Sequence, residues 1–197
     1  MVPIDLAHQP GTVWEYSLAS DLLGRVVEAA SGERLADFLD RRLFRPLKMN
    51  DTAFWVPKEK IGRLAEPLAA DAATGKASNL MDVSAVPAND SGGAGGVSTA
   101  ADYLRFSQML LNGGQLDGVR VLSRSSVTLM VSDHLGTRIA ALPGSAGEFM
   151  WGGYAGTYFW VDPKEEIVAV YMVQAPGPLR PYYRRLFKQL VYAAIND

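Results

Sequence analysis

The feature that most constrains the fold is a continuous apolar run near the end of the chain, Ile167 to Val173. It follows an aromatic and β-branched segment, Thr157 to Val161, and the turn-forming residues Asp162 to Glu165. This pattern predicts an antiparallel hairpin whose second strand is covered on both faces, since apolar residues occupy both of its alternating sides. The segment from Glu148 to Trp151 is a candidate third strand.

So few strands leave the apolar strand Ile167–Val173 with a free edge. A long apolar edge with unpaired backbone groups favours pairing with another chain. We therefore expect either strands from a complementary chain or self-association of two copies through this edge.

Elsewhere the sequence predicts helices and long loops. Apolar spacing predicts a helix from Ser17 to Ser31 that ends at Gly32, and a second over Leu35–Leu43 that ends at Pro46. The segment Glu66–Asn89 has no clear period and is expected to be a long loop. Three further helices are expected after the capping residues Ser98 or Thr99, after Ser123, and from Pro181 onward.

The predicted fold class is therefore α+β, an antiparallel sheet packed with helices, in a single partial domain over residues 1–197. Residues 1–132 are expected to be mainly helical with long loops, and residues 133–197 to hold the strands and the last helix. An apolar content of 48% is that of a globular protein with a core.

Composition also narrows the function. The net charge is −2 with both signs scattered, which argues against a nucleic-acid partner. The absence of cysteine excludes disulfides and thiolate chemistry, and His8 and His134 stand alone, so we expect no metal or organic cofactor. No stretch approaches the roughly 20 apolar residues of a membrane span, and the first residues do not form a signal peptide. We expect a soluble, cytoplasmic protein without a membrane partner.

Tyr16 stands directly before a predicted helix, where its hydroxyl can point into a cleft. A nearby cation would lower the pKa of such a hydroxyl and let it act as a general base. The alternative is a packing tyrosine with a hydrogen-bonded hydroxyl.

Trp151, Gly152, Gly153 and Tyr154 precede a predicted strand. Paired glycines allow a ligand to approach the backbone, and the Tyr154 N–H could polarise a substrate carbonyl. The alternative is a tight turn without a role in binding.

A glycine-rich loop, Gly92 to Gly96, precedes another predicted helix. It lacks the spacing of dinucleotide and P-loop motifs, so a structural role is favoured. The preceding Asn89-Asp90-Ser91 is similar to the nucleophile segment of trypsin-like proteases, but the chain has too much predicted helix for their two-barrel fold.

Taken together, these segments resemble the serine β-lactamase-related superfamily, which includes class C β-lactamases, DD-peptidases and family VIII carboxylesterases. Four stretches carry the resemblance in order: PGTVWEYSLASDLLGRVVEAASG, LFRPLKMNDTAF, GGAGGVSTAADYLRFSQMLLNGG and WGGYAGTYFWVDPKEEIVAVYMVQ. The resemblance implies that Tyr16 lies on the base side of a catalytic site and that the Tyr154 amide is an oxyanion donor. It also implies a small-molecule ester or amide substrate, bound beside Trp151, Gly152 and Gly153.

Two details resemble the esterase branch of that superfamily. Its lactamases carry Asn two residues after the tyrosine and Lys-Thr-Gly on the late strand, whereas this chain has Leu18 and Trp151-Gly152-Gly153. Without a cation at position 151, binding of a β-lactam carboxylate is disfavoured.

The superfamily's nucleophile is the serine of a Ser-x-x-Lys motif that precedes the tyrosine. None of the six lysines has serine three residues earlier; they are Lys48, Lys58, Lys60, Lys76, Lys164 and Lys188. The chain thus resembles the C-terminal half of a member, and the stretch His134–Glu148 looks short.

Three hypotheses follow. The first is an esterase-like serine hydrolase that needs a complementary N-terminal part and is inactive alone. The second is a catalytically silent binding or assembly module that associates through its free sheet edge. The third is a gene relic or an engineered piece without a function of its own.

Overall fold

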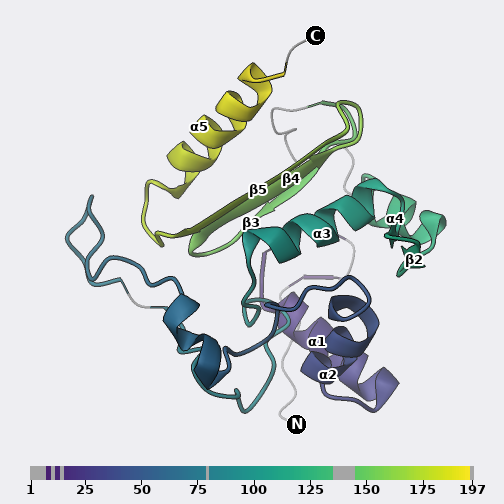
Figure 1. Cartoon of the computed structure of the whole chain (residues 1–197), viewed down its shortest axis with the longest axis horizontal. Coiled ribbons are helices and arrows are strands. Elements are labelled where there is room, and N and C mark those ends of the chain that lie inside the picture. The colour runs from purple at the N-terminus through teal and green to yellow at the C-terminus, as the bar shows by residue number, and fades with distance from the viewer. Residues whose placement is uncertain (1–7, 10–11, 14–15, 79, 135–144, 196–197) are drawn as a thin grey trace.

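The computed structural model describes residues 8–9, 12–13, 16–78, 80–134 and 145–195 of the 197-residue chain. Its centre is an antiparallel sheet with helices on both faces (Figure 1). Helix α5 (Arg180–Ala193) lies on one face, and helix α3 (Ala100–Leu111) crosses the other. The α+β class predicted from the sequence is confirmed.

The sheet has the strand order β3-β4-β5, formed by β3 (Phe149–Gly152), β4 (Gly156–Asp162) and β5 (Ile167–Gln174). Both pairings are antiparallel. The predicted hairpin, its turn and the third strand are thus confirmed. The Asp162 carboxylate accepts hydrogen bonds from the amides of Lys164 and Glu165, which closes the turn.

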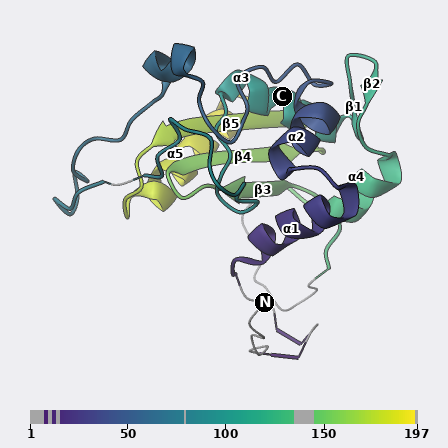
Figure 2. The ribbon, with the colours of Figure 1, turned by 90° about the horizontal axis from the view of Figure 1, so that it is seen from below.

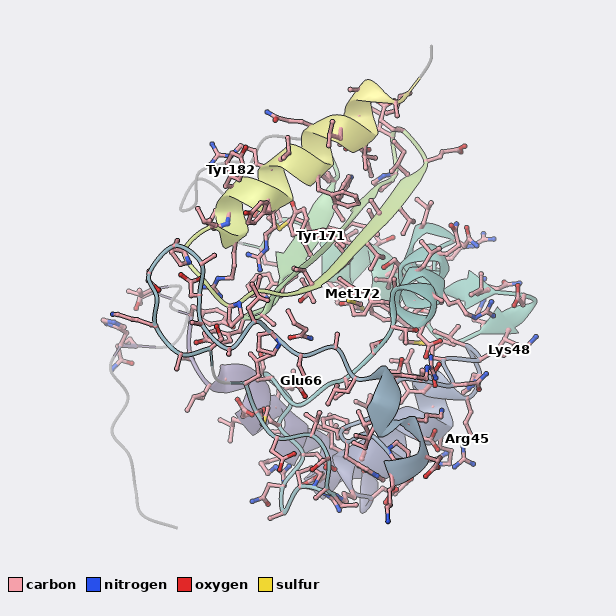
Figure 3. The ribbon with its side chains drawn as sticks, turned by 60° about the vertical axis from the view of Figure 1, so that its left-hand side comes forward. Arg45, Lys48, Glu66, Tyr171, Met172 and Tyr182 are labelled. Carbon is pink, nitrogen blue, oxygen red and sulfur yellow. The ribbon has the colours of Figure 1, made fainter. Side chains whose placement is uncertain are left out.

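Strand β5 is less buried than its apolar sequence predicts. Ala169 is its one residue that is fully buried, and its other residues are half-buried. The ring of Tyr171 stacks on Phe187 of α5 at a centroid distance of 5.0 Å. Figure 3 shows Tyr171 between β5 and α5, with Met172 on the opposite face. Within the described ranges no strand pairs with the outer edge of β5.

Helix α1 (Ala19–Ser31) begins two residues later than predicted, because Leu18 occupies the N-cap and the Ser17 hydroxyl accepts a hydrogen bond from the Ala19 amide. Gly32 ends it in the left-handed conformation, as predicted. The second apolar stripe is α-helical only in α2 (Leu35–Leu39) and continues as a π-helical turn, Asp40–Phe44.

The capping predictions are confirmed. The Thr99 hydroxyl accepts from the Asp102 amide at the start of α3, and the Ser123 hydroxyl accepts from the Ser126 amide at the start of α4 (Arg124–Val131). A 3-10 helix at Lys58–Arg63 and the short hairpin of β1 (Gln115–Leu116) and β2 (Val119–Arg120) were not predicted.

The apolar core is divided among three clusters. The first packs α3 and α4 around Leu47 and Met109, and the second packs α1 and α2 around Phe54. The third packs the sheet against α5 around Trp160, which is completely buried. None of the helices in the described part of the chain has the length and apolar content needed to cross a membrane.

Candidate active site

Tyr16 and Trp151, which lie far apart in the sequence, meet in the structure. Their ring centroids are 5.8 Å apart with an interplanar angle of 32°. Tyr16 comes from the segment before α1, and Trp151 comes from β3; Figure 2 shows α1 running alongside the β3 edge of the sheet. Both side chains are open to solvent, with exposed fractions of 69% and 53%.

The turn between β3 and β4 presents a free backbone donor three residues after Trp151. Gly153 donates its amide to the Thr157 carbonyl at 2.9 Å, and Gly156 donates its amide to the Gly153 carbonyl at 3.1 Å. Among the described residues, the Tyr154 N–H has no hydrogen-bond acceptor. An exposed N–H of this kind can donate to a substrate oxygen.

Side chains of the chain itself lie close to both glycines of this turn. A Cβ atom at Gly152 would lie 2.6 Å from Nη1 of Arg184, and one at Gly153 would lie 2.2 Å from Oγ1 of Thr157. The space above both glycines is therefore filled by side chains of the chain itself. The turn holds its shape before any ligand binds.

Two arginines of α5 hold the turn from the opposite side to Tyr16. Arg180 donates Nη1 to the Tyr154 carbonyl, and its guanidinium lies 5.1 Å from the centroid of the Tyr154 ring. Arg184 donates to the carbonyls of Gly153 and Gly156. Burial and the nearby Arg180 lower the pKa of the Arg184 guanidinium below its usual value. The sequence analysis missed both arginines, although their spacing of four residues places them on one helix face.

The glycine-rich loop has the structural role that the sequence favoured. The Ser91 hydroxyl donates to the Asp21 carboxylate, and it also accepts from the Ala94 amide. A Cβ at Gly92 would lie 2.4 Å from the Ser20 carbonyl oxygen, so the loop packs directly on α1. This contact fixes the start of the helix that follows Tyr16.

Asp90, the other part of the protease-like segment, is also engaged inside the fold. Its carboxylate is completely buried and accepts from the guanidinium of Arg34 and the amide of Ala36. His134 contacts the Leu129 carbonyl at 2.7 Å through Nε2. In the described ranges no group of three potential metal ligands gathers.

Comparison with known proteins decides the family. The family description "Beta-lactamase" matches residues 3–193. The chain belongs to the Beta-lactamase family. It is similar to Protein Rv1367c of Mycobacterium tuberculosis, with 32% identity over 207 residues, which covers 88% of this chain and 52% of that protein. It is also similar to Lovastatin esterase of Penicillium rubens, with 34% identity over 152 residues, covering 72% of this chain and 36% of the esterase.

Solved structures of other proteins share the fold. A mutant of the simvastatin synthase LovD from Aspergillus terreus matches with a TM-score of 0.80 at 23% identity, over 95% of this chain and 58% of LovD. EstCE1, a hydrolase with promiscuous acyltransferase activity, matches with a TM-score of 0.75 at 24% identity, over 90% and 56% of the two chains. The chain spans about half the length of Protein Rv1367c and about a third of that of Lovastatin esterase.

Proposed function

We propose that this chain carries the tyrosine and the oxyanion-binding turn of an esterase-like serine hydrolase, which transfers an acyl group to water. The observation that carries the proposal is the contact between Tyr16 and Trp151, the residue that stands three places before the free N–H of Tyr154. Similarity to Lovastatin esterase supports an ester substrate. So does a match of 49% identity over 49 residues to Esterase EstB of Burkholderia gladioli.

In the proposed reaction a serine hydroxyl attacks the carbonyl carbon of a small-molecule ester. Tyr16, on the base side and ionised to the phenolate, takes the hydroxyl proton and later returns it to the leaving alcohol. The carbonyl oxygen accepts a hydrogen bond from the Tyr154 N–H as negative charge develops on it. The alcohol leaves with a proton, and water then releases the acid from the acyl-serine. An amide could react in the same way, with an amine as the leaving group.

Trp151, Gly152 and Gly153 are proposed to form the substrate-binding wall. The exposed indole of Trp151 offers an apolar surface at the position where lactamases of this superfamily carry a cation. We therefore propose that the ester has no carboxylate at this point.

The serine nucleophile is proposed to come from residues outside these 197, since the sequence contains no Ser-x-x-Lys. We infer that the chain alone does not turn over esters. Removal of the nucleophile from serine hydrolases leaves only a small residual rate.

Turnover after complementation tests this function. The chain is co-expressed with a polypeptide that supplies Ser-x-x-Lys, cut from a longer relative such as Protein Rv1367c, and p-nitrophenyl esters are added. We expect hydrolysis that Tyr16→Phe lowers by about 10²- to 10⁴-fold, the usual contribution of a general base.

The chain without its complement is the control, and it should be inactive. Strong turnover by the chain alone would contradict the proposed need for an outside serine. Equal turnover by Tyr16→Phe and the unchanged chain in the complex would exclude a role for Tyr16 as base.

A second candidate function is a catalytically silent module that assembles through its sheet. The supporting observation is the outer edge of β5, which has no partner strand in the described part of the chain. Backbone groups along such an edge can pair with a second copy or with a strand of another protein.

A further inference from the structure

The turn after β3 is held by hydrogen bonds to four consecutive carbonyl groups. The Gly153 oxygen accepts from Arg184 and from the Gly156 amide, and the Tyr154 oxygen accepts from Arg180. The Ala155 oxygen accepts from the Ala175 amide at 2.7 Å, and the Gly156 oxygen accepts from Nε of Arg184 at 3.2 Å. Three of these carbonyls are thus held by arginines of α5, and the Ala155 carbonyl is held by the residue that follows β5.

Arg184 contributes two of these hydrogen bonds from a single planar group. Its guanidinium bridges the Gly153 and Gly156 carbonyls, which are the two ends of the turn. The group lies against Gly152, where a Cβ atom would come within 2.7 Å of Cζ. It also lies 5.9 Å from the centroid of the Tyr158 ring. No carboxylate in the described ranges forms an ion pair with Arg184.

The geometry of a peptide bond links Arg184 to the candidate oxyanion donor. The Gly153 carbonyl and the Tyr154 N–H belong to the same peptide group, and no cis peptide bond occurs in the described part of the chain. In a planar trans peptide these two groups point in opposite directions. Because Arg184 holds the carbonyl toward α5, the Tyr154 N–H points away from α5. Helix α1, which follows Tyr16, lies on the other side of the sheet (Figure 1).

The charge of Arg184 acts on the same peptide group. A guanidinium that donates to the Gly153 oxygen withdraws electron density from the amide, and hydrogen bonds in a chain polarise one another. The Tyr154 N–H thus becomes a stronger donor toward an oxyanion than an amide whose carbonyl faces water.

We propose that Arg184 is a positioning residue that sets the direction and the strength of the Tyr154 N–H through the Gly153–Tyr154 peptide group. An effect of Arg184 on catalysis rests on the proposed function. Its effect on the orientation of the Gly153–Tyr154 peptide group rests on the contacts alone. Arg180 supports the next peptide group in the same manner.

Amide exchange and chemical shifts of the 197-residue chain test the conformational claim. In Arg184→Gln we expect the Gly156 amide, which donates to the Gly153 oxygen, to exchange about tenfold faster or more, as for the loss of a charge-assisted hydrogen bond. The Tyr154 amide resonance should move as well. Arg184→Lys keeps the charge without the planar fork, so an intermediate change is expected.

Arg185→Gln is the matched control, since Arg185 is the exposed next residue of α5 and has no contact with the turn. Exchange in α3 reports the integrity of the fold. Equal changes in Arg184→Gln and Arg185→Gln would overturn the inference. An equally large rise in the exchange rate of the α3 amides would also overturn it, because it would show that Arg184 only stabilises the whole fold.

The complemented esterase adds a catalytic readout. Arg184→Gln should lower kcat by about tenfold or more with little change in KM, because the donor acts mainly in the transition state. If the complemented chain shows no esterase activity, the proposed function fails, while the exchange and shift measurements still decide whether Arg184 sets the turn. If Arg184→Gln changes the exchange and chemical shifts of the turn but leaves kcat unchanged, Arg184 has no role in catalysis.

Discussion

At the scale of single residues, the side chain and the backbone amide of Tyr154 have different proposed roles. The residue is 67% exposed and its ring lies beneath the guanidinium of Arg180, whereas its N–H is the proposed oxyanion donor. A backbone role leaves little trace in a sequence, because any residue supplies an N–H except proline. Substitutions that separate the two groups are therefore more informative than alanine.

We predict that Tyr154→Pro lowers the kcat of the complemented esterase, whereas Tyr154→Phe leaves it nearly unchanged. Proline removes the N–H and should lower kcat by about 10²- to 10³-fold, the usual cost of losing one oxyanion donor. Phenylalanine keeps the amide and the ring, so kcat should stay within about twofold. Steady-state kinetics on p-nitrophenyl esters measures both, and a large loss in Tyr154→Phe would instead assign the role to the phenol hydroxyl.

At the scale of elements, the attachment of α5 to the sheet depends on a buried polar group as well as on apolar packing. The Tyr192 hydroxyl contacts the Asp162 carboxylate at 2.5 Å and the Glu148 carboxylate at 2.9 Å. Burial, followed by these two carboxylates, raises the pKa of the Tyr192 phenol. Lys188 of the same helix forms an ion pair with Glu148.

We predict that Tyr192→Phe lowers the free energy of unfolding by about 1–3 kcal/mol, because two buried carboxylates lose their shared donor. Tyr182→Phe is the control on the same helix, where Figure 3 shows Tyr182 at the surface, with 56% of it exposed. Its effect should stay within about 0.5 kcal/mol. Urea denaturation measures both variants, and equal destabilisation would show that the shared hydroxyl contributes nothing.

The elements with clear local signals were predictable. The hairpin of β4 and β5 followed from an apolar run and a turn, and the Thr99 and Ser123 caps followed from hydroxyls before helices. The β1–β2 hairpin had a signal as well, since Asp117 and Gly118 both adopt positive φ in an Asp-Gly turn that suits a two-residue hairpin. The π-helical turn at Asp40–Phe44 has no such signal, because it depends on tertiary packing.

The candidate site was predictable only in part. Tyr16 and Trp151 were identified from motifs, but their contact joins segments separated by most of the chain. The sequence explained Gly152 and Gly153 by the approach of a ligand, and the structure adds that Arg184 and Thr157 lie close to them. Contacts of this kind depend on how α5 docks, which no local pattern specifies.

At the scale of the whole molecule, apolar surface remains uncovered on α1. Residues of α1 and of the segment before it lie more than half exposed, although they are large and hydrophobic; they are Leu18, Leu22, Leu23 and Val26. The outer edge of β5 lies elsewhere on the molecule and also lacks a partner in the described ranges. Uncovered surface of this kind is typical of protein interfaces.

If the β5 edge mediates self-association, light scattering should show a molar mass that rises with concentration. Met172→Lys places a charge on the outermost strand of the sheet, on the face opposite α5, and should weaken the association, since lysine on an edge strand opposes pairing. Met130→Lys is the control, because Met130 is 59% exposed on α4. Circular dichroism checks that both variants are folded. A constant monomer mass at every concentration would exclude assembly through this edge.

The docking of α5 by Arg180 and Arg184 has a practical consequence for handling the protein. The last helix of the chain reaches the turn that carries the proposed oxyanion donor through two side chains, so tags, fusions or deletions near the C-terminus can alter this turn from a distance. Affinity handles are better placed in the Asp117–Gly118 hairpin, which lies on a separate small sheet.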